Sequence, residues 1–164
     1  MLELEIRSAT RDDVPLILSF IKELAEYERL SQEVVATEEG LRDSLFGERP
    51  VAEVLIGHLG DEPAGFALFF HSFSTFLGRP GIYLEDLYVR PAFRGTGVGR
   101  TLLVRLVELA TERGCGRLEW SVLNWNKPAI SFYKALGAVP MDEWTVYRVT
   151  GDAVGDLAAG RRLP

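Results

Sequence analysis

The stretch Arg94-Gly95-Thr96-Gly97-Val98-Gly99-Arg100 decides the fold of this 164-residue chain. It follows a predicted strand over residues 82–89 and precedes a predicted helix, whose apolar face comprises Leu102, Leu103, Leu106, Leu109 and Ala110. A glycine-rich loop between a strand and a helix turns backbone N–H groups towards a ligand, and the helix N-terminus adds partial positive charge. This order of elements therefore predicts a phosphate-binding loop.

Other interpretations of the glycine loop fit less well. A P-loop needs Gly-Lys-Ser/Thr at its end, whereas Arg100-Thr101 follow the glycines here. The dinucleotide pattern needs G-x-G-x-x-G in the first βα unit, but this G-x-G-x-G comes late, after a predicted hairpin. The remaining alternative is a loop whose glycines serve only a tight turn.

The rest of the chain mixes helices and strands. Apolar alternation predicts strands over 3–7, 51–56, 65–70, 82–89, 118–123 and 144–149, with a turn at 60–63 and a loop at 72–80. Thr10, Thr37 and Asn126 are predicted helix N-caps. The sequence thus predicts an α/β (α+β) fold with one domain over 1–150. The tail over 151–164 has few large apolar residues, so no structure is predicted there.

Composition excludes several classes of function. Apolar residues make up 47% of the chain and charged residues 26%, and no apolar run reaches the ~20 residues of a membrane span. The net charge of −6 argues against a nucleic-acid partner and suits a cationic small molecule. One cysteine, Cys115, and two histidines, His58 and His71, argue against a metal site. The N-terminus lacks a signal peptide, so we expect a cytoplasmic protein.

The glycine loop resembles the R-x-x-G-x-G/A signature of the GCN5-related N-acetyltransferase (GNAT) superfamily, whose loop binds the pyrophosphate of acetyl-coenzyme A. Further segments resemble its diamine (spermidine/spermine-type) and thialysine acetyltransferase branch. They are IR-x-AT at 6–10, KELAEYE at 22–28, YLEDLYV at 83–89, WNKPAISFYK at 125–134 and EW at 143–144. The resemblance covers residues 4–150. It implies a central mixed, mostly antiparallel sheet flanked by about four helices.

Such a reaction needs a base, because an alkylammonium with a pKa near ~10.4 has no lone pair with which to attack a thioester. Glu85 is the candidate, and a solvated or salt-bridged strand carboxylate is the alternative. Strict alternation places Glu85 and Asp86 on opposite faces of the strand. The resemblance implies that Glu85 faces the amine and that Asp86 is structural. A bulge in this strand would alter that facing.

The leaving thiolate of coenzyme A benefits from a proton donor, and a tyrosine hydroxyl suits that role. Spacing alone favours Tyr133 as an aromatic core residue. The resemblance instead implies that Tyr133 is the general acid.

The resemblance also implies the cosubstrate site. Main-chain groups of the strand supply an oxyanion donor near Leu87 and pair with the pantetheine arm. Asn126 has two candidate roles, a helix N-cap or a contact with coenzyme A. The implied cofactor-binding residues are Leu87, Tyr88, Val89, Arg94, Gly95, Thr96, Gly97, Val98, Gly99, Arg100 and Asn126.

The acceptor site follows from the same resemblance. Acidic residues around position 28 usually form only a solvated face, but in the resembling branch a Tyr-Glu pair helps to bind the distal part of a cationic substrate. Either Asp142 or Glu143 completes that site. The implied substrate-binding residues are Tyr27, Glu28, Glu85, Asn126, Lys127, Pro128, Ala129 and Glu143.

We therefore expect an acetyl-CoA-dependent N-acetyltransferase that acts on a small polycationic or amino-acid-like amine and needs no metal. The alternatives are an acceptor on a protein N-terminus or an antibiotic, and a non-catalytic acyl-CoA-binding module. The resemblance further implies a homodimer with residues 144–149 near its interface.

Overall fold

The computed structural model describes residues 1–161 of the chain. The chain divides into two compact units, Met1–Leu123 and Asn124–Pro164. The first unit contains β1 (Leu4–Ser8), η1 (Arg11–Asp13), α1 (Val14–Tyr27), η2 (Ser31–Glu33), α2 (Glu38–Phe46), β2 (Glu53–Leu59), β3 (Glu62–Ser74), β4 (Arg79–Val89), η3 (Pro91–Phe93), α3 (Val98–Glu112) and β5 (Leu118–Trp120), where η marks a 3-10 helix. The second unit contains α4 (Lys127–Ala135) and α5 (Asp152–Ala158).

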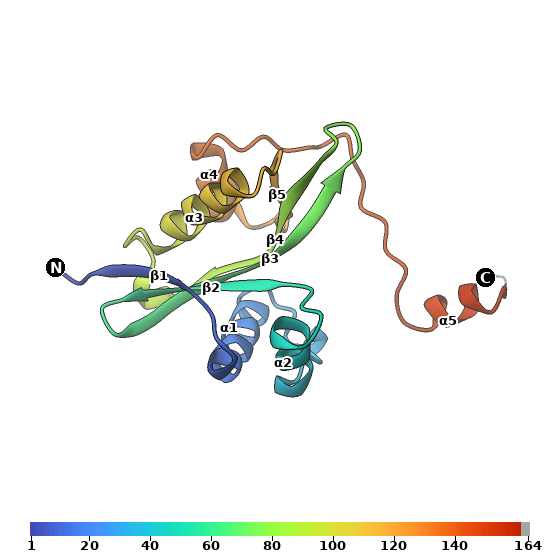
Figure 1. Ribbon diagram of the computed structural model, residues 1–164, viewed down its shortest axis with the longest axis horizontal. Coiled ribbons are helices and arrows are strands. Elements are labelled where there is room, and N and C mark those ends of the chain that lie inside the picture. The colour runs from blue at the N-terminus through green and yellow to red at the C-terminus, as the bar shows by residue number, and fades with distance from the viewer. Residues whose placement is uncertain (162–164) are drawn as a thin grey trace. The chain divides into compact units, whose positions relative to one another are not determined.

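The sheet of the first unit is mixed and mostly antiparallel, as the sequence predicts. Within residues 1–161 it has five strands in the order β1-β2-β3-β4-β5. Consecutive strands are antiparallel except β4 and β5, which run parallel. Figure 1 shows α1 and α2 on one face of this sheet and α3 on the other. The predicted fold class is therefore confirmed.

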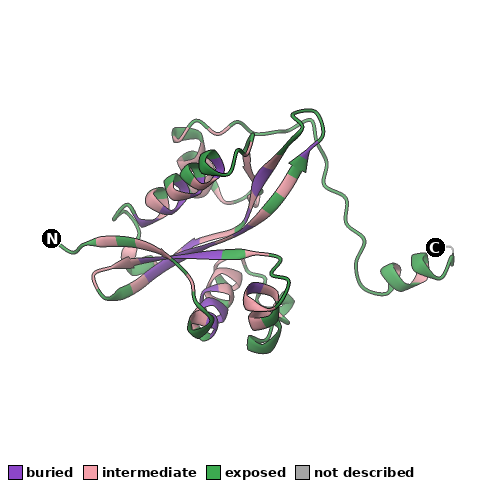
Figure 2. Cartoon of the chain, in the orientation of Figure 1, coloured by how far each residue is buried: buried purple, intermediate pink, exposed green. Residues whose placement is uncertain are grey.

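Each face of the sheet has its own core. On the side of α1 and α2, the rings of Phe20 and Phe66 stack at 5.2 Å between centroids, and Ile17 is fully buried. On the side of α3, Leu102 and Leu106 are fully buried. Figure 2 shows buried residues in the sheet and in the helices that cover both of its faces. Burying each large apolar side chain stabilises the fold by about 1.5–3 kcal/mol.

The predicted caps are at the helix starts. Thr37 Oγ1 accepts a hydrogen bond from the Gly40 N–H at 3.1 Å, and Asn126 Oδ1 accepts one from the Ala129 N–H at 3.4 Å. Thr10 precedes η1, which leads directly into α1, and its N–H donates to Asp13 Oδ2 at 2.7 Å. These polar side chains satisfy N–H groups that a helix leaves without partners.

The predicted loop over 72–80 is mostly strand. Phe73 pairs with Pro80, and Ser74 pairs with Arg79, so only four residues connect β3 to β4. Gly78 lies in that connection with φ of 63°, a conformation that favours glycine. Phe76 is fully exposed at the turn. The serines, the threonine and the single glycine of the segment reflect this exposed hairpin end rather than a long loop.

The predicted last strand over 144–149 is wrong for the chain as described, because residues 138–150 form neither helix nor strand. We call this segment the C-terminal arm. Alternating apolar residues favour a strand, but a strand also needs a neighbour for its hydrogen bonds. Figure 2 colours almost all of the arm as exposed. The large apolar residues exposed there are Val139, Met141, Trp144, Val146, Tyr147 and Val149.

The tail is also more ordered than its sequence predicts. Residues 152–158 form α5, which begins after Gly151 with φ of 60°. Val154 and Leu157 are half-exposed on this short helix. The low apolar content of the tail is therefore compatible with a helix of two turns.

Candidate functional site

A β-bulge interrupts β4 at Glu85. Leu68 of β3 pairs with Asp86, but the next residue, Phe69, pairs with Leu84. Glu85 is therefore the extra residue, and it is exposed. A bulge leaves such a residue out of the regular ladder and bends the strand.

The bulge changes which face of the sheet each β4 side chain occupies. Leu84 pairs with Phe69, whose ring lies 5.9 Å below the guanidinium of Arg113 at the end of α3. Asp86 instead pairs with Leu68, which packs against the core beneath α1. Residues 84 and 86 thus face opposite sides, although strict alternation would place them together. Asp86 consequently lies on the α1 side of the sheet.

Asp86 is the most perturbed acid of the site. Burial, followed by the nearby charges of Glu85 and Glu28, raises the pKa of its carboxyl to about 6. Burial also raises the pKa of Glu28, which caps the C-terminal end of α1. A carboxylate in such surroundings gains from a cation that replaces lost water and offsets its neighbours. The three carboxylates suit an ammonium group. We call Glu28, Glu85 and Asp86 the acidic cluster.

The resemblance implies a structural role for Asp86, whereas the structure places it in the acidic cluster. The signal that could have revealed it was the mismatch in the apolar pattern of β4. Ile82, Leu84 and Tyr88 are buried, and a strand without a bulge would put an acid among them on one face. A bulge between them resolves that conflict.

The β4–β5 ladder ends before the bulge. Parallel pairing joins Ile82–Leu84 to Leu118–Trp120 and extends no further. Within residues 1–161, no strand therefore pairs with residues 85–89 on the β5 side of β4. A strand edge without a neighbouring strand can pair with an extended ligand that has amide groups, such as a pantetheine arm.

The glycine loop has the geometry of an anion site. Gly95 and Gly97 have φ of 76° and 95°, and no heavy atom lies within 4 Å of a Cβ built on either. Gly97 is the N-cap of the 15-residue α3, so the first N–H groups of a long helix have no partner within it. No acidic residue lies in the first turn of α3. These features fit a pyrophosphate group.

Arg94 connects the glycine loop to the end of α1. Its Nε donates to the carbonyl of Val89 at 3.1 Å. Its guanidinium carbon lies 4.9 Å from the ring centroid of Tyr27 and 5.9 Å from that of Tyr88. A cation over aromatic faces is attracted by their quadrupoles. The predicted cofactor residue and the predicted acceptor residue therefore touch in the first unit.

The first unit thus brings together Tyr27, Glu28, Glu85, residues 87–89 and the glycine loop. Asn126, Lys127–Ala135 and residues 142–143 belong to the second unit. Within that unit Asn126 caps α4, and Tyr133 lies on α4 with its ring 5.5 Å from that of Phe132. Asp142 and Glu143 are exposed in the C-terminal arm.

Two further kinds of feature, a metal site and a membrane-spanning helix, were sought among residues 1–161. Among residues 1–161, no group of three or more His, Cys, Asp or Glu side chains is arranged to hold a metal ion. In the same residues, no helix has the length and apolar character to cross a membrane.

Comparison with known proteins identifies the relatives of this chain. The model of the acetyltransferase (GNAT) family matches residues 19–138. The thialysine N-epsilon-acetyltransferase of Bos taurus is 42% identical, over 93% of this chain and 96% of the relative. The enzyme of that name from Caenorhabditis elegans is 40% identical, over 96% of this chain and 99% of the relative. An L-ornithine N5-acetyltransferase of Arabidopsis thaliana is 34% identical, over 91% and 85%.

Solved structures share the fold. An integron cassette protein from the mobile metagenome of V. cholerae superposes with a TM-score of 0.80 at 29% identity, over 96% of this chain and 99% of the other. An aminoglycoside acetyltransferase from a soil metagenome, in complex with sisomicin, has a TM-score of 0.75 at 17% identity, over 90% and 95%. The second likeness concerns the fold alone.

Proposed function

Because this chain belongs to the GNAT family of acetyltransferases, we propose that it moves the acetyl group of acetyl-CoA onto a primary amine of a small cationic substrate. The proposed acceptors are thialysine, related amino acids with a side-chain amine, and diamines or polyamines. The acidic cluster carries this proposal, because it gathers three carboxylates around one partly desolvated site. The names of the relatives support the amino-acid end of this range.

Recognition of the acceptor follows from the electrostatics of the acidic cluster. An ammonium beside Asp86 offsets the repulsion from Glu85 and Glu28 that raises the pKa of Asp86. Tyr27, at the end of α1, adds an aromatic face to the acceptor site. We propose that residues of the second unit complete the acceptor site. They are Asn126, residues 127–129 and either Asp142 or Glu143.

Catalysis begins with the removal of a proton from the ammonium. In the proposed reaction Glu85 takes this proton through a water molecule, and its exposed position on the bulge gives it access to water. The amine nitrogen then attacks the thioester carbon, and a main-chain N–H near Leu87 stabilises the oxyanion. As the tetrahedral intermediate collapses, the C–S bond breaks and Tyr133 protonates the thiolate. The nitrogen loses its second proton to water, and the Tyr133 phenolate regains a proton from water. The products are an acetamide and free coenzyme A.

Acetyl-CoA is the cosubstrate of this family, and the glycine loop is its proposed binding site. The N–H groups of residues 95–100 would hold the pyrophosphate at the start of α3, and Arg94 and Arg100 add positive charge. The pantetheine arm would pair with the main chain of residues 87–89, where β4 has no neighbour on the β5 side within the described chain. The proposed reaction needs no metal.

We also propose that the enzyme is a homodimer that uses the C-terminal arm. Trp144 is 77% exposed and Tyr147 92% exposed, and large apolar side chains in such numbers are costly to leave in water. Their alternation suits a strand, and a second copy can supply the missing neighbour. The proposed compartment is the cytoplasm, because the one cysteine, Cys115, stays free.

The test is the release of free thiol from acetyl-CoA in the presence of putrescine, spermidine, spermine, lysine, ornithine or thialysine. We expect rapid release with at least one of these amines, and the preferred amine then defines the subclass. If no amine in this panel supports release while acetyl-CoA still binds, the small-amine proposal is wrong. A peptide N-terminus and an aminoglycoside would then be tried, before a binding module without catalysis.

A further inference from the structure

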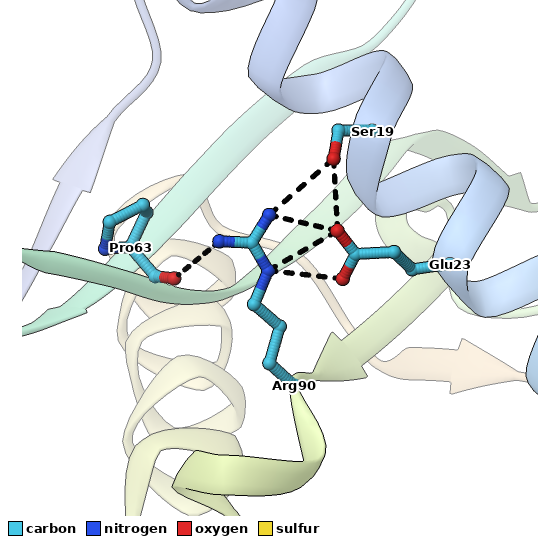
Figure 3. Close-up of polar contacts among 4 residues, drawn as sticks. All are labelled: Ser19, Glu23, Pro63 and Arg90. Atoms are coloured by element: carbon cyan, nitrogen blue, oxygen red, sulfur yellow. Dashed lines mark hydrogen bonds and ion pairs between the residues drawn. The ribbon is translucent and has the colours of Figure 1, made fainter.

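Arg90 holds together three segments of the first unit (Figure 3). Its Nη2 donates to Oε1 of Glu23 at 2.8 Å, and its Nε donates to Oε2 at 3.0 Å. Its Nη1 donates to the carbonyl of Pro63 at 3.1 Å, and its Nη2 also reaches Ser19 Oγ at 3.4 Å. The guanidinium carbon lies 4.7 Å from the ring centroid of Phe20. Arg90 thus ties the end of β4 to α1 and to the start of β3.

Arg90 and Glu23 each lie four residues before a residue of the proposed binding sites. Arg90 directly follows β4, and Arg94, which opens the glycine loop, comes four residues later. Glu23 lies on α1, and Tyr27 comes four residues later on the same face of that helix. Arg90 contacts Glu23, and Arg94 contacts Tyr27. Two arginines at the same spacing therefore join the cofactor segment to the acceptor helix.

We propose that Arg90 and Glu23 are a positioning pair, which sets the end of α1 relative to the glycine loop. Neither residue contacts a substrate in this proposal. When the pair is broken, Arg94 and Tyr27 no longer meet in the same geometry. Acetyl-CoA and the amine therefore both bind more weakly. The proposal rests on the function proposed above, because it takes the glycine loop as the acetyl-CoA site and Tyr27 as part of the acceptor site.

The geometry distinguishes this pair from an ordinary surface ion pair, which contributes about 0–1 kcal/mol. The fork of Arg90 meets both carboxylate oxygens of Glu23, and this arrangement fixes orientation as well as distance. The hydrogen bonds from Arg90 lower the pKa of Glu23. Ser19 Oγ also donates to Oε1 of Glu23 at 2.9 Å, so the carboxylate is held from two sides.

The chain offers a matched control in the Arg113–Glu53 pair. It too is bidentate, with Nη1–Oε2 and Nη2–Oε1 distances of 2.6 and 2.9 Å, and it too joins separate elements of the first unit. Its side chains are 32% and 45% exposed, against 27% and 31% for Arg90 and Glu23. The control pair takes no part in the proposed binding of either substrate.

The experiment compares Glu23→Gln with Glu53→Gln. Calorimetry gives the Kd of coenzyme A, thiol release gives kcat and the KM of the preferred amine, and a thermal melt gives Tm. For Glu23→Gln we expect Kd and amine KM each to rise about tenfold, with kcat within about twofold of wild type. Both variants should lower Tm by a similar amount. Glu53→Gln should leave Kd, KM and kcat unchanged.

Further variants make the result decisive. Arg90→Lys keeps the charge but loses the fork, so its Kd and KM should lie between wild type and Glu23→Gln. The double variant Glu23→Gln/Arg90→Gln should be no worse than the more affected single variant, because both break the same contact. Should Glu23→Gln fail to fold, Arg90→Lys carries the comparison with Glu53→Gln.

The outcomes separate this proposal from the function on which it rests. If wild type binds no coenzyme A and releases no thiol, both are wrong. If wild type is active and Glu23→Gln changes Tm alone, as Glu53→Gln does, Arg90 and Glu23 are merely structural and the positioning proposal is overturned.

Discussion

Replacing Asp86 with asparagine should make the protein more stable and a poorer binder of its amine. Burial and neighbouring charges raise the pKa of the Asp86 carboxyl from 3.8 to about 6. Ionising this carboxyl therefore costs the folded state about 3 kcal/mol, at about 1.36 kcal/mol per pKa unit. Asparagine keeps the shape of the side chain and does not ionise, so Asp86→Asn escapes this cost.

The effect depends on pH, with a sign that follows from proton binding. The folded state holds the Asp86 proton more tightly than the unfolded state does. The stability from this group is therefore complete below pH ~4 and is lost as the pH rises through ~6. Asp86→Asn should exceed wild type by about 3 kcal/mol at pH 8, and by only about 1 kcal/mol at pH 4.5.

Urea unfolding, followed by the fluorescence of the three tryptophans, measures this difference at both pH values. Thiol release gives the second readout, since loss of the carboxylate should raise the KM of the amine. For wild type the same KM should rise as the pH falls below ~6, because protonated Asp86 no longer attracts an ammonium. A stability difference that is equal at pH 8 and pH 4.5, or a variant less stable at pH 8, would refute the reasoning.

Three other predictions concern the loop, the acid and the arm. Gly97→Val forces a β-branched residue to φ of 95°, so the loop should distort and calorimetry should show coenzyme A binding at least about tenfold weaker; unchanged binding would rule out the loop as the cosubstrate site. Tyr133→Phe should lower kcat by about 100-fold and leave the Kd of coenzyme A unchanged, and full turnover would remove Tyr133 as the acid. Light scattering should give the mass of a dimer for wild type and of a monomer for Trp144→Asp/Tyr147→Asp, whereas a monomeric wild type would contradict the role of the arm.

The parts of the fold that the sequence predicted well depend on local chemistry. Thr37 and Asn126 cap helices because their side chains reach N–H groups only three residues away. The glycine loop and α3 follow from glycines at positive φ and from a helical apolar period. Each of these features is determined by residues close together in the chain. A single sequence, without an alignment of relatives, was therefore enough to predict it.

The parts that the sequence did not predict depend on distant segments. The sequence leaves strict alternation and a bulge open for this strand, and the pairing of β4 with β3 decides between them and places the bulge at Glu85. The same limit explains the C-terminal arm, where alternation around Val146 predicted a strand without saying which strand would pair with it. For the site, the sequence places Glu85 and Asp86 on the same strand, but the burial of Asp86 depends on the face that the bulge gives it.

The bulge also limits how β4 can change in evolution. Before it, Ile82 and Leu84 pack beneath α3, whereas Tyr88 beyond it packs beneath α1. The extra residue lets even-numbered positions of one strand serve two cores. Deleting Glu85 would restore an unbroken ladder and turn one of these apolar sets towards the wrong helices. The side chain at position 85 can therefore be exchanged by a point substitution, but a single-residue deletion there should be selected against even in a relative that has lost its activity.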